Sequence, residues 1–209
     1  MTVKGDLLDA KAAANRGFSG LHGWMRKAEA VWNENAESGK MTLLGRWNYH
    51  NELGAQFPIA PLRVVYSRSG TLQASAVVRD RHHVVDFSLY HAACATIPEC
   101  RYLTALFNSE VARRRVEGQQ SRGAWGARDF AKIMFTLPIP RFDPKNTLHA
   151  ELAEAAREAE EIAATVPLSE SVKFQRARKL VRDALTEAGI APRIDALVAR
   201  LLDEPVRRS

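Results

Sequence analysis

The chain contains an unusual order of segments between residues 102 and 140. An apolar helical pattern ends in Asn108-Ser109, a stretch rich in arginine and glycine follows, and a short apolar run then stops at Pro138 and Pro140. Proline cannot donate a hydrogen bond to a β-ladder, so residues 132–137 are predicted to form a strand that ends at these prolines. Any fold of this chain must therefore accommodate a helix, a basic loop and a strand end in close succession.

The composition is that of an ordinary globular protein. Apolar residues make up 46% and charged residues 26% of its 209 positions, which is enough apolar content for a buried core. No stretch reaches the roughly 20 apolar residues of a membrane span, and the polar N-terminus lacks the apolar run of a signal peptide. The two cysteines, Cys94 and Cys100, make no disulfide framework and are interpreted as small buried side chains. We therefore expect a cytoplasmic protein with no membrane partner.

Helical spacing of apolar residues predicts five helices. The first covers residues 21–37 and ends before Gly39, and the second runs from Pro98 to Val116. The last third of the chain is predicted to be helical throughout, with breaks at Pro167 and Gly189. Its three helices are expected from Asn146 or Thr147 to Val166, from Ser169 or Ser171 to Gly189, and from about Pro192 onward.

The strand signals lie in the first half of the chain. Residues 62–65 and 72–78 flank a turn signal at 67–70 and predict a hairpin, with 84–87 as a third strand. Residues 86–95 are ambiguous between strand and helix, and 43–60 indicate short strands or an ordered loop. We predict an α+β fold with a small mixed β-sheet, packed helices and a helical C-terminal extension. The expected division is an N-terminal helical segment (1–40), an α+β body (41–145) and the C-terminal extension (146–209).

Basic charge is concentrated in the middle of the chain. Residues 61–145 hold 13 Lys and Arg against 7 Asp and Glu, a net charge of +6. Residues 1–60 hold 7 against 6 and residues 146–209 hold 10 against 11, so these flanks nearly cancel. Of the 13 basic residues, 11 are arginine, whose planar guanidinium suits phosphate and guanine. This asymmetry favours a polyanionic partner.

The central block resembles the target-recognition domains of bacterial restriction-modification systems. The resemblance is carried by Tyr102-Leu103-Thr104-Ala105-Leu106-Phe107-Asn108-Ser109, the following Arg-Gly-x-x-Gly stretch, and Phe135-Thr136-Leu137-Pro138-Ile139-Pro140. It is strongest to the C-terminal, DNA-reading part of adenine-specific DNA methyltransferases, covers about residues 40–165, and extends more distantly to the specificity subunits of type I systems. It implies a domain that binds duplex DNA and presents it to a methyltransferase catalytic domain or subunit.

The candidate DNA contacts combine side chains that pair with phosphate or with base edges. Arginine pairs with guanine and glutamine with adenine through two hydrogen bonds, and glycines allow a close approach to phosphate. Alternatively, the three arginines at 113–115 favourably meet a helix dipole, Trp125 is a buried anchor, and the loops at 66–70 and 79–83 are solvated turns. The candidates are Arg68, Arg79, Arg81, His82, Arg113, Arg114, Arg115, Gln119, Gln120, Arg122 and Arg128.

The chain lacks the motifs of catalysis. It contains no Gly-rich nucleotide loop after a strand and no Asn-Pro-Pro-aromatic or Asp-Pro-Pro-aromatic tetrapeptide, the motif that holds the target amine in amino-methyltransferases. We therefore expect no catalytic residue and no cofactor in this chain, with S-adenosylmethionine bound by the separate catalytic domain. His91, Cys94 and Cys100 are near in sequence but match no zinc spacing, so no metal site is expected.

The sequence thus predicts a DNA-binding target-recognition domain of an adenine-specific DNA methyltransferase. The alternative is a specificity or scaffold subunit that acts mainly through protein–protein contacts. The helix after Asn146 either spaces recognition domains, as in type I specificity subunits, or packs on its own domain. Its glutamate-rich outer face is expected to point away from DNA. These glutamates are Glu151, Glu154, Glu158, Glu160 and Glu161.

Overall fold

A computed structural model of the chain describes most of its residues and separates them into two compact units. The first unit comprises Met1–Ala60 and Arg81–Phe87, and the second comprises Pro61–Asp80 and Ser88–Ser209. This grouping differs from the three-part division above, because the C-terminal helices share a unit with the sheet. The described residues are 2–3, 6–37, 39–68, 75–86, 88–119, 121–123, 126–129 and 131–203.

The first unit is built mainly from short helical segments. Its longest helix, α2 (Ser19–Asn35), confirms the prediction of a helix over 21–37 and packs against α1 (Ala10–Asn15). The expectation of strands or a loop over 43–60 is wrong for much of this segment, which contains one α-helix and two short 3-10 helices. Local side-chain hydrogen bonds favour these helical turns over strands. The Thr42 hydroxyl accepts from Gly45 N–H, and the side-chain oxygen of Asn48 accepts from Gly54 N–H. The remaining elements are β1 (Thr2–Val3), β2 (Asp6–Leu7), α3 (Leu43–Trp47), η1 (Tyr49–Asn51) and η2 (Gly54–Gln56).

The second unit contains a three-stranded antiparallel sheet in the order β4-β3-β5. Its strands are β3 (Arg63–Ser67), β4 (Ser75–Val78) and β5 (Leu89–Ala93). The predicted hairpin is confirmed, because Tyr66 pairs with Ser75 and Arg63 with Val78. The sheet is wholly antiparallel rather than mixed. Its connecting turn at 69–74 lies outside the described residues.

The third strand does not lie at 84–86 as predicted, and Phe87, the last residue of the predicted strand, lies outside the described residues. Both backbone groups of Val85 are bound by one side chain, since the Gln56 amide donates to Val85 O at 2.8 Å and accepts from Val85 N at 2.7 Å. These bonds replace those of a ladder, and no strand forms over residues 84–86. The strand instead covers Leu89–Ala93, which settles the ambiguity over 86–95.

The predicted helix over 98–116 is two helices that meet at Ser109. Thr96 caps α4 (Ile97–Asn108) and Ser109 caps α5 (Glu110–Glu117). After α5, β6 (Ser121–Gly123) and β7 (Gly126–Asp129) form a short antiparallel hairpin where a loop is predicted.

The prediction of a strand over 132–137 is wrong. Residues Ala131–Thr136 form the 3-10 helix η3 instead. Met134 and Leu137 are both buried, and this three-residue spacing brings them to the same side of a helical turn. The tertiary core therefore selects the helical period over the alternating one.

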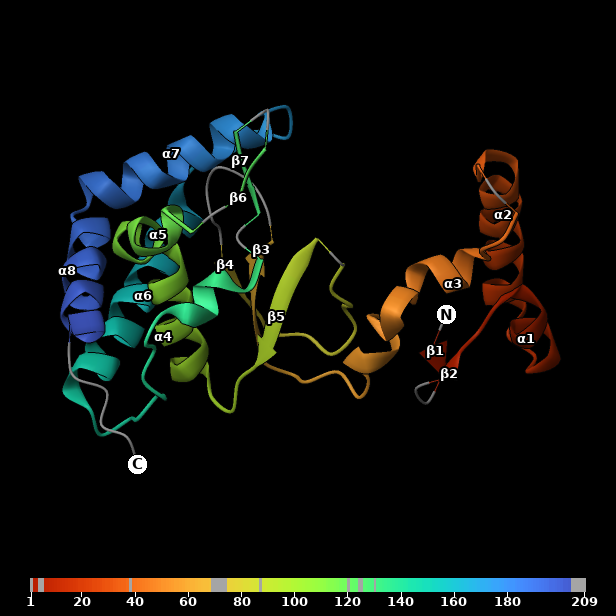
Figure 1. The fold of residues 1–209 in the computed structure, drawn as a ribbon, viewed down its shortest axis with the longest axis horizontal. Coiled ribbons are helices and arrows are strands. Elements are labelled where there is room, and N and C mark those ends of the chain that lie inside the picture. Colours follow the sequence, from red (N-terminus) through yellow and green to blue (C-terminus); the bar gives the residue numbers. More distant parts are fainter. Residues whose placement is uncertain are drawn as a thin grey trace. The chain divides into compact units, whose positions relative to one another are not determined.

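The three predicted C-terminal helices are confirmed. They are α6 (Thr147–Thr165), α7 (Phe174–Glu187) and α8 (Ile190–Asp203), and Asn146 caps α6 through Leu148 N–H and His149 N–H. Helix α6 packs against α4 and α8 (Figure 1). Leu106, Leu152, Val198 and Leu201 are fully buried in the shared core. The predicted α+β class is therefore confirmed. Among the described residues, no helix is long and apolar enough to cross a membrane.

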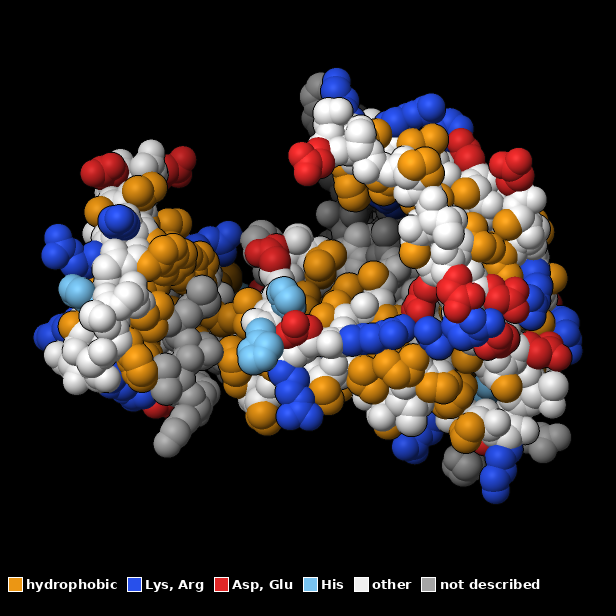
Figure 2. Space-filling view, turned by 180° about the vertical axis from the view of Figure 1, so that it is seen from behind, with side chains coloured by type: hydrophobic (Ala, Val, Ile, Leu, Met, Phe, Trp, Pro, Cys, Tyr) orange, Lys and Arg blue, Asp and Glu red, His pale blue; other side chains and the backbone are white. Residues whose placement is uncertain are grey.

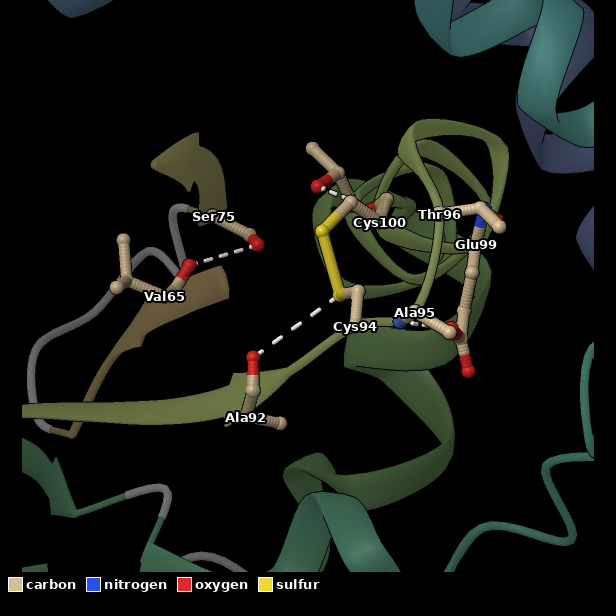
Figure 3. The surroundings of a disulfide bond; sticks show 9 residues. Val65, Ser75, Ala92, Cys94, Ala95, Thr96, Glu99 and Cys100 are labelled. Carbon is tan, nitrogen blue, oxygen red and sulfur yellow. Dashed lines mark hydrogen bonds between the residues drawn. A yellow bond between two sulfur atoms is a disulfide. The ribbon is translucent and has the colours of Figure 1, made fainter. Parts of the chain in front are cut away.

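Cys94 and Cys100 form a disulfide, which contradicts their interpretation as two separate small side chains (Figure 3). Cys94 follows β5 and Cys100 lies in α4, and the intervening turn brings their Cα atoms to 5.6 Å, within the range that a disulfide spans. The turn is held by Thr96, whose hydroxyl accepts from Glu99 N–H, and by Glu99, whose carboxylate accepts from Ala95 N–H. The disulfide therefore links the end of the sheet to α4.

Helix α5 is capped at its start by a carboxylate from α8. Asp195 Oδ1 accepts from the N–H of Glu110 at 2.8 Å and of Val111 at 3.4 Å. N–H groups in the first turn of a helix have no partner within that helix, so the carboxylate supplies one.

Asp195→Ala should therefore lower the free energy of unfolding, measured by urea denaturation, by about 1–2 kcal/mol. Asp183→Ala removes an exposed carboxylate of α7 and should cost less than about 0.5 kcal/mol. Equal effects of the two variants would contradict the capping role.

Candidate nucleic-acid interface

The Asn-Ser step between α4 and α5 positions the edge of the sheet. Asn108 Oδ1 accepts from Ser75 N–H at 2.8 Å, and Asn108 Nδ2 donates to Ser75 O at 2.9 Å. Ser109 Oγ accepts from Ala112 N–H at 3.0 Å and donates to Leu106 O at 2.9 Å. The motif therefore holds the first residue of β4 and starts the next helix.

Arg68 directly follows β3, at the other end of the connection between β3 and β4, and is held by the sheet. The backbone N–H of Arg68 donates to the backbone carbonyl of Ser88 at 3.1 Å, and its guanidinium carbon lies 5.7 Å from the centre of the Tyr90 ring. Tyr90 stacks on Tyr66 at 5.3 Å, and Tyr66 contacts Phe107 of α4 at 5.0 Å. Among the described side chains, no carboxylate pairs with Arg68. This arginine is therefore supported by an aromatic column while its N–H groups stay available to a ligand.

The two ends of the central block contact each other directly. The Tyr102 hydroxyl donates to Pro140 O at 2.9 Å, and its ring lies 5.5 Å from the ring of Phe142. Tyr102 is fully buried in α4. This bond fixes the proline-containing segment against the helix that begins the block, which is a framework role.

The three arginines of α5 form ion pairs within the chain. Arg113 donates to both carboxylate oxygens of Glu110, at 2.5 and 2.8 Å, and lies 3.4 Å from Glu117. Arg115 pairs with Asp203 and also donates to Leu202 O at 3.2 Å, which joins α5 to the end of α8. Arg114 is 72% exposed, and its Nε lies 3.1 Å from Glu110. Arg113 and Arg115 therefore stabilise the fold, whereas Arg114 extends into solvent.

The glutamates of α6 are neutralised by arginines rather than left as an acidic face. Glu160 pairs with Arg79 at 3.0 Å and with Arg101 at 2.9 Å, so the candidate Arg79 is already bound. Figure 2 shows acidic and basic side chains lying side by side over this helix. The other pairs are Glu154 and Glu161 with Arg157, Glu158 with Arg193, and Glu151 with Arg200.

The remaining candidates are distributed over both units. The Oε1 atom of Gln119 lies 3.4 Å from the Thr136 hydroxyl oxygen. Arg122 lies in β6 and Arg128 in β7, where the structure describes the backbone alone. Gln120 and Trp125 lie outside the described residues.

Arg81 and His82 belong to the first unit. Both are exposed in the segment that follows Asp80, together with His83. The structure therefore groups Arg68 with Arg79 and the α5 arginines in the second unit, and it groups Arg81 with His82 in the first.

No metal-binding cluster occurs in the part of the chain that the structure describes. The sulfur atoms of Cys94 and Cys100 are bonded to each other, so in this state neither offers a thiolate to a metal. No family model, curated protein or solved structure matches the chain.

The sequence does not predict the role of Asn108, although the Asn-Ser motif itself is recognisable. Its partner, Ser75, is 33 residues away in the sequence. No local pattern signals such a contact, because the side-chain amide of Asn108 replaces a backbone partner at the sheet edge.

Asn108→Ala should release the start of β4. The variant loses both bonds to Ser75, so the free energy of unfolding should fall by about 1–2 kcal/mol and the Ser75 amide should exchange faster with deuterium. Gln175→Ala on the exposed side of α7 serves as the control and should alter neither quantity. Unchanged protection of the Ser75 amide from exchange would show that the two Asn108–Ser75 hydrogen bonds do not stabilise the start of β4.

The Glu110–Arg113 pair predicts a pH dependence. The hydrogen bond from Arg113, aided by Arg114 and opposed by burial, lowers the pKa of Glu110 from 4.5 to about 2. A lowered folded-state pKa gives stability that is present above about pH 4.5 and is lost as the pH falls through about 2. In Arg113→Gln, the Glu110 pKa measured by carboxyl NMR should rise toward 4.5, but Arg178→Gln should leave it low. If the Glu110 pKa did not change in Arg113→Gln, the Arg113 hydrogen bond would not be the cause of its low value.

Proposed function

We propose that the chain is the DNA-binding target-recognition domain of a bacterial adenine-specific DNA methyltransferase from a restriction-modification or related defence system. In this proposal it binds duplex DNA and presents it to a catalytic domain or subunit outside this chain, where S-adenosylmethionine is bound. The observation that carries the proposal is the support of Arg68 by Tyr90 beside a sheet connection whose other end is held by Asn108.

This arrangement suits recognition because it presents a cation at low conformational cost. A guanidinium that rests on an aromatic ring loses little freedom when it binds, and its fork can pair with guanine or phosphate. The connection at 69–74 adds Ser69, Gly70, Thr71 and Gln73, which are small or hydrogen-bonding residue types. We assign Arg68, Arg81, His82 and Arg114 to DNA contact, and Arg79, Arg113 and Arg115 to the framework.

A scaffold function is the second candidate, and one observation favours it. On α2 of the first unit, Val31 is 60% and Trp24 49% exposed, and Trp24 stacks on Trp47 with ring centres 5.9 Å apart. Large exposed apolar side chains are typical of surfaces that bind other proteins. In the first proposal this surface contacts the catalytic domain, whereas in the second such contacts are the main function.

Selection from random duplexes tests the proposal. The purified chain should retain duplex DNA with a dissociation constant of roughly micromolar or weaker, and log affinity should fall with log salt by about 0.9 per phosphate contact. Arg68→Gln should weaken binding by about 1–3 kcal/mol on the preferred sequence and relax the preference at one base pair.

Arg141→Gln provides the matched control for Arg68→Gln. Arg141 is exposed whereas Arg68 is half-buried, and among the described residues Arg141 has no ion-pair partner. It should change affinity far less than Arg68→Gln. A salt-independent signal, or no enrichment of any sequence, would contradict DNA recognition and favour the scaffold function.

A further inference from the structure

Helix α7 carries a dense basic segment that the regional charge count conceals. Within residues 173–182 there are five basic residues and no acidic one. The net charge of −1 over residues 146–209 hides this segment because the glutamates of α6 fall in the same sum. The basic residues are Lys173, Arg176, Arg178, Lys179 and Arg182.

These side chains lie mostly on the solvent side of the helix. Arg176, Lys179 and Arg182 are exposed and follow each other at intervals of three residues, so they form a row along one side. Leu180 and Leu185 are half-buried on the side that packs toward α6 and α8. The helix therefore uses its apolar side for packing and presents its cations outward.

The pairing of these cations differs from that of the arginines around α6. Every glutamate of α6 named above has an arginine partner. In contrast, among the residues that the structure describes, no carboxylate forms an ion pair with Lys173, Arg176 or Arg182. Lys179 pairs with Asp183 at 2.6 Å, an exposed contact between neighbouring turns of one helix. The basic row is thus largely uncompensated.

The positions are also unfavourable for the isolated helix. Lys173 is the N-cap and Arg176 lies in the first turn, where the helix dipole disfavours positive charge. Arg178 and Arg182 are like charges four residues apart, which repel. Burial and the charge of Arg182 lower the pKa of Arg178 below its usual value. A polyanion bound along this side would relieve the repulsion.

A nucleic-acid backbone fits this surface better than a membrane does. Interfacial membrane helices insert a broad apolar face, but the apolar side of α7, which includes Leu180 and Leu185, is half-buried against α6 and α8. Phe174 is 72% exposed at the start of the helix, where the Arg178 guanidinium carbon lies 5.4 Å from its ring centre. An aromatic ring beside a row of cations is typical of nucleic-acid surfaces.

We propose that the exposed side of α7 is a second DNA-binding surface, which contacts the phosphate backbone through Lys173, Arg176 and Arg182. It rests on the proposed function and extends it, because it assigns sequence-independent affinity to the C-terminal helices and sequence reading to the connections of the sheet. Phosphate contacts position a protein on DNA without carrying sequence information.

The test compares three triple variants of the full chain. K173Q/R176Q/R182Q removes the proposed contacts, and K173R/R176K/R182K keeps their charge. R26Q/R141Q/K145Q removes the same charge from exposed residues elsewhere; none of the three has an ion pair in the described part of the chain. Anisotropy with a random fluorescent duplex gives the slope of log affinity against log salt, and circular dichroism checks folding.

The neutral α7 variant should reduce the slope by as much as about 2.7, since each phosphate contact contributes about 0.9. The charge-preserving variant should keep the slope of the unmodified chain, and the control should lose much less. The neutral α7 variant should lose the same affinity on all DNA sequences, including the preferred sequence whose binding depends on Arg68.

Other outcomes overturn the inference in distinguishable ways. If the unmodified chain binds DNA with dependence on Arg68 but the α7 variant keeps its slope, the α7 surface fails and the proposed function stands. If the unmodified chain shows no salt-dependent DNA binding, both fail. Tighter binding to anionic phosphatidylserine vesicles than to duplex DNA, lost in the neutral variant, would assign the surface to a lipid headgroup instead.

Discussion

The packing of α6 and α8 against α4 determines where Arg79, Arg101 and Arg115 are held. Leu106, Leu152 and Val198 are fully buried in this contact, and burying such side chains contributes about 1.5–3 kcal/mol each. The same two C-terminal helices supply Glu160, which binds Arg79 and Arg101, and Asp203, which binds Arg115. Without this packing, the arginines would lose the partners that orient them.

Formal charge and available charge are therefore different quantities in this protein. The sequence places its excess of arginine in residues 61–145, but several of these arginines neutralise carboxylates of the C-terminal helices. The cations of α7 belong to a region whose summed charge is slightly negative, yet among the described residues most of them lack such partners. A charge count along the chain cannot separate these two groups, because ion pairs form between residues that are distant in sequence.

Much of the secondary structure was predictable, and its errors share one physical cause. The helices α2, α6, α7 and α8 and the β3–β4 hairpin follow from periodicity and capping, which act over a few residues. The strands predicted at 84–87 and 132–137 fail because short apolar runs do not distinguish strand from helical turn. Gln56 binds Val85, and the core takes up Met134 and Leu137, so contacts outside each run decide its conformation.

The sequence by itself determined the α+β class, the helical C-terminal third and the position of the Asn-Ser motif. Tertiary structure decided what the motif does, since Asn108 binds Ser75 at a separation of 33 residues and Asp195 caps α5 at a separation of 85. It also decided which arginines are bound within the chain and which are exposed. Local patterns encode periodicity and caps, but the partner of a polar side chain depends on which surfaces the folded core brings together.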